Sequence, residues 1–236
     1  MTGVCWPDRS KYGSSYWHPP VRAQHAAPRP PQKRPTPMPE NVQSFHGPLS
    51  ERVRAYTVAH CQSLTGRLLD VGCGNGLLFD ALATRTSLTC YGVDRSVELL
   101  NAVRHRHSRT GCVNGLLDHL PFQNHSFNVV TCLNTLLNLA TIDRVTIALT
   151  EMMRITAGQV IVDIRNADNP YMRLKYWRHR QTAGFPTVAY HLSDIRKVFQ
   201  NGGFSVERVY PVGVNNRWLA WGYVVVGRRE NLIEKG

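Results

Sequence analysis

The stretch Leu68–Gly76, LLDVGCGNG, begins with a short, mostly apolar run. Three glycines follow within five positions. Glycine adopts positive φ and leaves room for a ligand to approach the backbone. Where such glycines lie between a strand and a helix, the helix N-terminus adds free N–H groups that can bind the ligand. The stretch therefore predicts a strand, a ligand-binding loop and a helix, which together form one unit of an α/β domain.

The sequence around this stretch alternates between strand and helix patterns. Several strand candidates are continuous apolar runs, which is typical of a parallel sheet covered by helices on both faces. The last two strands predict an antiparallel hairpin at the edge of the sheet. The predicted strands span residues 67–71, 88–94, 112–117, 127–133, 159–164, 204–212 and 219–227, and the predicted helices span residues 51–64, 77–84, 97–106, 144–155 and 192–203.

The first predicted helix begins after Pro48. We expect Ser50 to cap its N-terminus, since a serine hydroxyl accepts hydrogen bonds from free backbone N–H groups there. Apolar residues recur at helical spacing and predict one face packed on the domain. That face comprises Val53, Tyr56, Ala59 and Leu64.

Composition bounds the class of protein. The chain has 236 residues, of which 42% are hydrophobic, and no apolar run approaches the roughly 18 residues of a membrane span. We therefore expect one sizeable domain without a transmembrane segment. The first twenty residues have no continuous apolar core and do not resemble a secretory signal, so we expect a cytoplasmic location. Import into an organelle stays open, because the N-terminal segment is rich in arginine and poor in acids.

The cysteines and histidines give no metal-binding pattern. Six cysteines show no CxxC pairing, and five of them fall within apolar or motif segments, so we interpret them as reduced thiols. The ten histidines show neither HExxH nor zinc-finger spacing. We expect no metal ion.

The proline content divides the chain. Residues 1–48 hold ten of the fourteen prolines and six basic residues against two acids. Such a segment cannot bury enough apolar area to fold alone, so we expect a disordered basic tail. The predicted domain spans residues 49–229, and residues 230–236 form a short C-terminal tail. The net charge of +12 favours anionic partners.

Two further segments join the glycine stretch in a fixed order. Asp70 precedes the glycines, Asp94 ends the next predicted strand in YGVDRS, and a third segment reads GLLDHLPFQNHSFNVV. These motifs resemble the class I S-adenosylmethionine-dependent methyltransferases, especially the branch whose third segment reads GDAxxLPFxDxSFDVV. The resemblance runs from about Arg67 to Arg165 and more loosely to Arg229. It implies a Rossmann-like, doubly wound, mostly parallel seven-stranded sheet and S-adenosylmethionine as the cofactor.

The resemblance also implies roles for individual residues. Asp70 would lie near the ammonium group of the cofactor, and Asp94 would accept hydrogen bonds from the two ribose hydroxyls. Asn134 would lie beside the methionine and the transferable methyl group. Arg95 would flank the adenine, and Leu117 would offer its backbone N–H to the ring. The methionine portion would contact the backbone of Gly72, Cys73, Gly74, Asn75 and Gly76.

Two positions depart from the pattern of the family. Leu116 stands where the family usually has an acid, so the adenine amine loses its expected acceptor. A missing buried partner costs about 1 to 3 kcal/mol, and Asp118, two residues on, is a candidate substitute. Asn128 replaces the aspartate of SFDVV, for which we expect a small effect because asparagine keeps an acceptor.

The segment 166–191 is the predicted substrate-side insertion or lid. Its cations and aromatic rings are suited to a phosphate beside an apolar or ring-bearing acceptor. An amphipathic lid whose aromatic rings pack on the domain is an equal alternative. His191 and Tyr171 are both candidate bases, and the sequence singles out neither, so the catalytic residue stays unassigned. The candidate substrate residues are Tyr171, Arg173, Tyr176, Arg178 and His191.

Three functions are compatible with these patterns. The first is O- or N-methylation of a small molecule, which the compact domain and the insertion favour, with an anionic acceptor suggested by the charge. The second is methylation of RNA or of a ribosome-associated target, favoured by the basic charge and the tail. The third is a non-catalytic scaffold that keeps the fold, suggested only by Leu116. No Asn-Pro-Pro-Tyr or Pro-Cys motif of nucleic-acid base methylation follows the predicted strands.

Overall fold

The computed structural model describes residues 47–182, 187–216 and 218–230. The predicted tails therefore lie outside the described residues, apart from the two residues before position 49 and the first residue of the C-terminal segment. The helices are α1 (Pro48–Cys61), α2 (Leu77–Leu82), α3 (Val97–Arg106), α4 (Ile142–Ile155), α5 (Pro170–Thr182) and α6 (Leu192–Asn201), with the 3-10 helix η3 (Leu136–Asn138). The strands are β1 (Arg67–Val71), β2 (Thr89–Asp94), β3 (Gly111–Asn114), β4 (Phe127–Cys132), β5 (Thr156–Arg165), β6 (Phe204–Val212) and β7 (Gly222–Arg229).

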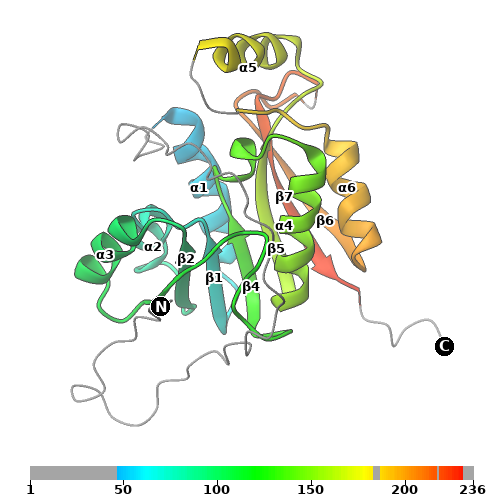
Figure 1. The fold of residues 1–236 in the computed structure, drawn as a ribbon. Helices are drawn as coiled ribbons and strands as arrows, with labels where there is room; N and C mark the ends of the chain where they lie inside the picture. The colour runs from blue at the N-terminus through cyan, green and yellow to red at the C-terminus, as the bar shows by residue number, and fades with distance from the viewer. Residues whose placement is uncertain (1–46, 183–186, 217, 231–236) are drawn as a thin grey trace, which may run out of the picture.

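The seven strands form one sheet in the order β3-β2-β1-β4-β5-β7-β6. The strands from β3 to β5 pair in parallel, whereas β7 is antiparallel to both β5 and β6 (Figure 1). This arrangement confirms the predicted mostly parallel, doubly wound sheet and its C-terminal antiparallel pair.

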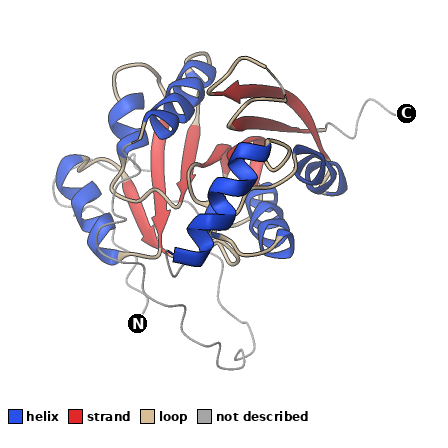
Figure 2. Cartoon of the chain, turned by 90° about the horizontal axis from the view of Figure 1, so that it is seen from above, coloured by secondary structure: helices blue, strands red, loops and turns tan. Residues whose placement is uncertain are grey.

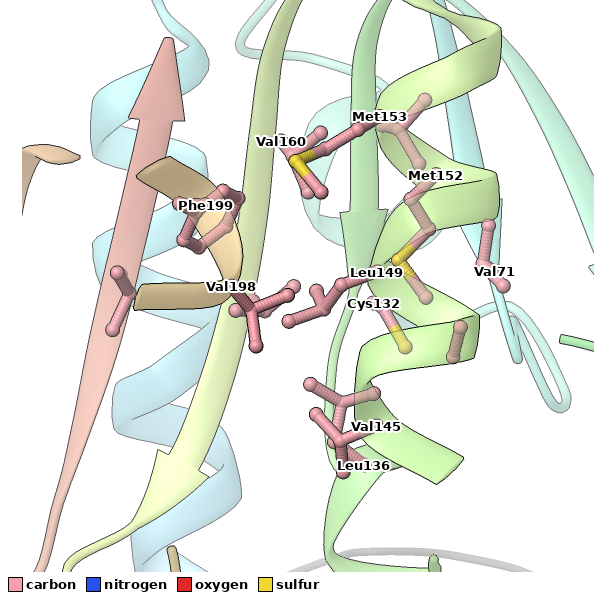
Figure 3. Packing of buried hydrophobic residues seen from close by; sticks show 14 of the residues in the cluster. Val71, Cys132, Leu136, Val145, Leu149, Met152, Met153, Val160, Val198 and Phe199 are labelled. Atoms are coloured by element: carbon pink, nitrogen blue, oxygen red, sulfur yellow. The ribbon is translucent and has the colours of Figure 1, made fainter. Parts of the chain in front are cut away.

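Helices cover both faces of the sheet, because successive side chains of a buried strand point to opposite faces. In β1, Leu68 packs in a cluster with α1 and α2, while Leu69 packs in a second cluster with α4 and α6. The second cluster contains residues of α4 such as Leu149 and Met152, which face the strands beside α6 (Figure 3). Alternate residues of each continuous apolar run thus pack against the helices on opposite faces of the sheet.

The predicted cap of α1 is wrong, and its predicted buried face is right for Val53 and Leu64 but wrong for Tyr56 and Ala59. The N-cap is Gly47, with Pro48 in the first turn, and Ser50 lies inside the helix. The buried residues are Ser50, Val53, Thr57, Val58 and Cys61, whereas Tyr56 and Ala59 are exposed. Polar residues face the domain here because Thr57 bonds its own helix at the carbonyl of Val53, and Ser50 bonds a residue beyond β4. A pattern that counts only apolar residues therefore misses the buried polar residues of this face.

The insertion 166–191 contains α5, which lies over the edge of the sheet where the parallel strands end (Figures 1 and 2). Met172 faces inward and is buried, and Asn169 accepts from the backbone N–H groups of Tyr171 and Met172 at 2.9 and 3.2 Å. Within the described ranges, no helix is long and apolar enough to cross a bilayer.

Candidate active site

The strand order reverses beside β1, since β2 and β3 lie on one side of it and β4 and β5 on the other. In open α/β sheets, a crevice for ligands forms outside the carboxyl ends of the strands at such a reversal. The loop Gly72–Gly76 follows β1 at this place. The backbone N–H groups of Gly72 and Cys73 donate to the carbonyl of Val93 at 2.7 and 3.1 Å, which fixes the loop against the end of β2.

Two glycines of this loop are required for different reasons. Gly72 has φ of +76°, and a Cβ built on it would lie 2.5 Å from Oγ1 of Thr135, so any side chain would clash with the protein. Gly74 has φ of +54°, and a Cβ built on it would meet no protein atom within 4 Å. Only at Gly74 does the missing side chain leave open space, which is the space a ligand would need.

Asp94 lies at the end of β2 beside this loop. Its Oδ2 accepts a hydrogen bond from the backbone N–H of Gly74 at 2.8 Å, and its Oδ1 accepts one from Ser96 at 2.9 Å. A carboxylate oxygen accepts more than one hydrogen bond, so both oxygens keep capacity for a ligand. Asp94 thus couples the glycine loop to the start of α3.

Asp70 lies one strand away in β1 and is buried. Burial raises the pKa of its carboxyl to about 7, a hydrogen bond from Oγ1 of Thr131 at 2.8 Å opposes that rise, and the negative charge of Asp94 adds to it. Burial likewise raises the pKa of the Cys73 thiol well above its ordinary value, which disfavours the reactive thiolate. The described cysteines are all free thiols: Cys61, Cys73, Cys90, Cys112 and Cys132.

The segment after β3 is hydrogen-bonded to the end of β2. Gly115 donates to the carbonyl of Asp94 at 3.1 Å, and the predicted strand ends early, at Asn114. Leu116 follows with 54% of its surface exposed, and Leu117 packs partly against the core. The carboxylate of Asp118 lies 3.5 Å from the guanidinium of Arg144 on α4. Two other predicted cofactor residues differ in their surroundings. Arg95 is exposed, and the backbone carbonyl of Asn75 accepts a hydrogen bond from Arg106 of α3.

Asn134, after β4, lies in a buried polar network. Its φ of +53° is left-handed, and its backbone N–H donates to Oδ1 of Asp163 at 2.5 Å. Its side-chain oxygen accepts from Oγ of Ser50 at 3.0 Å and from Nη2 of Arg165 at 2.8 Å. The network therefore joins α1, β4 and β5 at the carboxyl edge of the sheet.

The charged pair of this network was missed by the sequence reasoning. Nη1 of Arg165 lies 2.6 Å from Oδ2 of Asp163, and their side chains are only 4% and 0% exposed. Nε of Arg165 donates to the hydroxyl of Tyr176 on α5 at 3.2 Å. The signal was two charged residues, two positions apart, in the otherwise apolar strand QVIVDIR, since charges in a buried strand require partners.

The structure brings together three of the five candidate substrate residues. Arg173, Tyr176 and His191 line one cavity of about 650 Å³, whose other walls are mostly apolar. Arg178 lines a smaller cavity of about 400 Å³ on another side of α5, and Tyr171 lines neither. Nδ1 of His191 lies 2.6 Å from Oδ1 of Asp168. The first cavity is walled further by Ala167, Pro170, Leu174, Trp177, Thr187, Val188 and Ala189.

Comparison with known proteins agrees with this arrangement. Residues 69–162 match a family model described as a methyltransferase domain. No curated protein matches the chain by sequence.

Three solved structures illustrate the likeness of fold. The magnesium protoporphyrin IX methyltransferase ChlM from Synechocystis PCC 6803, solved with bound SAH, is 18% identical over 77% of this chain and 82% of that chain, with a TM-score of 0.61. The YcgJ protein from Bacillus subtilis is 14% identical over 77% and 99%, with a TM-score of 0.60. The pyocyanin biosynthetic protein PhzM is 18% identical over 76% and 55%, with a TM-score of 0.59.

The fold and the glycine loop define a doubly wound α/β protein, a class in which ligands bind at the reversal of strand order. The match over residues 69–162 shows that the chain contains a methyltransferase domain. Its fold is that of the S-adenosylmethionine-dependent methyltransferases, so the chain is an enzyme that uses S-adenosylmethionine as its cofactor.

Proposed function

We propose that the chain methylates an oxygen or nitrogen atom of a small molecule that enters the cavity beside α5. The observation that carries this proposal is the link through Tyr176. This residue lines the cavity, and its hydroxyl accepts from Arg165, which also binds Asn134. A cavity of about 650 Å³ has the size of a small-molecule site.

We propose that the cofactor lies over the glycine loop. Asp94 suits the ribose hydroxyls, because its carboxylate lies beside the open space at Gly74 and keeps acceptor capacity. Asp70 suits a nearby ammonium group, directly or through water, because a positive charge would relieve its burial cost. The methionine portion would contact the backbone of residues 72–76, Asn134 would lie beside the methyl group, and the adenine would lie among Arg95, Leu117 and Asp118.

Methyl transfer requires the protein mainly to position the acceptor against the methyl group. S-adenosylmethionine supplies a methyl group on a sulfonium, which is already activated for in-line displacement, so the placement of the nucleophile provides much of the rate. The cavity excludes water from part of the acceptor, and Arg173 offers an anionic acceptor a charged partner.

His191 is the base that the geometry favours. Its Nδ1 donates to Asp168, which leaves Nε2 as the acceptor for a proton from the nucleophile. Tyr171, the other candidate, is 63% exposed and lies outside the lining of the cavity.

The test is to supply the purified enzyme with methyl-labelled S-adenosylmethionine and a cell extract, and to separate the extract into RNA, protein and metabolites. We expect label in the metabolite fraction. We also expect His191→Ala to lower kcat more than it raises KM, since a base acts mainly in the transition state. Label confined to RNA or protein would overturn the small-molecule proposal.

RNA or a ribonucleoprotein is the second candidate acceptor. The observation in its favour is the net charge of +12 together with exposed cations of α5, among them Lys175 and Arg178. Nucleic-acid binding of this kind weakens steeply with salt, because phosphate contacts release counterions. A strong salt dependence of label transfer to RNA would favour this acceptor. The cytoplasmic location stays a prediction from the sequence.

A further inference from the structure

Exposed apolar side chains gather at the carboxyl edge of the sheet. Among the described residues, eleven large hydrophobic residues are exposed, and seven of them lie on α5 or on the loop between β6 and β7. Trp218 is 70% exposed and Trp177 is 53% exposed. We call these seven residues the apolar rim: Tyr171, Leu174, Trp177, Val214, Trp218, Leu219 and Trp221.

The two segments of the rim are tied together. Nδ2 of Asn169, at the start of α5, donates to the carbonyl of Leu219 at 2.9 Å. Nδ2 of Asn166 donates to the carbonyl of Ala220 at 3.0 Å, and its backbone N–H donates to the carbonyl of Trp221 at 3.1 Å. The two segments that carry the rim are therefore adjacent, and α5 lies above the upper ends of the strands in Figure 1. Exposed apolar residues gathered in this way mark an interaction surface.

The positive charges beside the rim favour an anionic partner. Helix α5 contains no acidic residue, and its exposed cations Arg173, Lys175 and Arg178 lie among the exposed apolar residues of the same helix. The nearest acid in sequence, Asp168, is paired with His191. Tryptophan and tyrosine favour the interface between water and lipid, and neighbouring lysine and arginine bind anionic headgroups.

We propose that the apolar rim docks on the surface of an anionic lipid bilayer, with α5 lying along the interface. Nucleic acid fits less well, because base binding uses aromatic rings, whereas Leu174, Val214 and Leu219 of the rim are aliphatic. Aliphatic and indole side chains both gain from insertion at the level of the headgroups. Leu174 and Trp177 of the rim also line the cavity proposed for the acceptor, whereas the residues changed in the test below do not line it.

Flotation of the full chain with lipid vesicles tests the proposal. We expect binding to vesicles that contain phosphatidylserine, and at least about tenfold weaker binding to vesicles of phosphatidylcholine alone, because several cations act together. The double variant Trp218→Ser with Leu219→Ser and the double variant Lys175→Gln with Arg178→Gln should each lose at least about tenfold in binding to the anionic vesicles. Ile147→Ser is the matched control, since Ile147 is an exposed apolar residue on α4 and its loss should not change binding.

Several outcomes would overturn the proposal. Binding that survives both double variants would come from another part of the chain, such as its basic N-terminal segment. Absence of binding to anionic vesicles, together with tight binding of single-stranded RNA that both double variants weaken, would assign the surface to nucleic acid. Circular dichroism of each variant checks that the fold is intact, and emission of the tryptophans should shift to shorter wavelength with anionic vesicles only.

Discussion

Nη2 of Arg165 donates a hydrogen bond to the side-chain oxygen of Asn134 at 2.8 Å, between the carboxyl ends of β5 and β4. The same guanidinium reaches Asp163 and the hydroxyl of Tyr176. One buried cation thus connects the residue proposed to lie beside the transferable methyl group with the helix that lines the proposed acceptor cavity. A displacement of Arg165 would therefore shift both Asn134 and Tyr176, since buried polar networks have few alternative arrangements.

The first prediction concerns this cation. Arg165→Met should lower the free energy of unfolding by about 3 to 5 kcal/mol, because it leaves the carboxylate of Asp163 buried without its partner. Urea unfolding followed by circular dichroism measures the change. The double variant Asp163→Asn with Arg165→Met is the control, and it should lose less than the sum of the two single variants. Additive losses would show that the two residues do not act as a pair.

The second prediction uses the open space at Gly74. Gly74→Ala should weaken binding of S-adenosylmethionine by at least about tenfold, because the new methyl group points into space where no protein atom lies within 4 Å. Isothermal titration calorimetry measures the affinity.

Gly203→Ala is the matched control for this variant. Gly203 also has positive φ, of +74°, and open space around its Cβ, but it lies in the turn between α6 and β6. Both variants should therefore lose similar stability, of about 1 kcal/mol, while only Gly74→Ala loses the cofactor. Equal cofactor binding in the two variants would remove the cofactor from the glycine loop.

The third prediction concerns Asp94. Asp94→Ala should lower cofactor affinity by about 2 kcal/mol or more, because a buried charged acceptor for two hydroxyls is lost. The variant also leaves the N–H groups of Gly74 and Ser96 without their acceptor, so the loop itself should loosen. Asp94→Asn separates the effects, since its amide keeps one oxygen as an acceptor. Unchanged calorimetric affinity in both variants would exclude the ribose role.

The sequence predicted the part of the fold that depends on local pattern. Helix α3 and strand β1 before the glycine loop have the predicted bounds, because apolar runs and glycines act over a few residues. Asp70, Asp94 and Asn134 were singled out through motif spacing, and they lie at the carboxyl ends of neighbouring strands.

The rest of the site depends on contacts far apart in sequence. Ser50 was expected to cap α1, but its hydroxyl bonds Asn134, which is 84 positions away. No local rule predicts such a partner. Asp163 and Arg165 could be noticed as charges in an apolar strand, but their partners Asn134 and Tyr176 follow only from the pairing of the strands and from the position of α5. Likewise, Arg178 and Tyr171 could be separated from Arg173 only once the orientation of α5 was known.

The fourth prediction concerns the adenine acceptor. Leu116→Asp should strengthen cofactor binding by about 1 to 3 kcal/mol, because it supplies the acid that the resemblance to the methyltransferases implies where this chain has an exposed leucine. If Asp118 is the substitute acceptor, Asp118→Ala should weaken binding by a similar amount, and Leu116→Asp should rescue it. Arg144→Gln is the control for the neighbouring ion pair, since it removes the partner of Asp118 and keeps the carboxylate. Calorimetry that finds no change in any of these variants would place the adenine amine in water.

The last prediction concerns proton release at Asp70. Burial raises the pKa of this carboxyl to about 7 in the free protein, so much of it is protonated below neutral pH. If the ammonium group of the cofactor binds nearby, it favours the carboxylate, lowers this pKa and causes a proton to leave. Cofactor affinity should therefore rise with pH, by up to about tenfold per pH unit, and level off above about pH 7. Calorimetry in buffers of different ionisation enthalpy measures the released proton.

Asp70→Asn provides the control, because it keeps the shape of the side chain and removes the titration. Its cofactor affinity should not depend on pH over this range, and no proton should be released. The free protein gives an independent readout. A raised pKa in the folded state means that the folded protein binds the proton more tightly than the unfolded chain, so the free energy of unfolding falls as pH rises from the ordinary value of 3.8 to about 7. Asp70→Asn should remove this part of the fall. If the fall disappears in the variant while wild-type affinity is independent of pH, Asp70 is a buried acid that the cofactor does not reach.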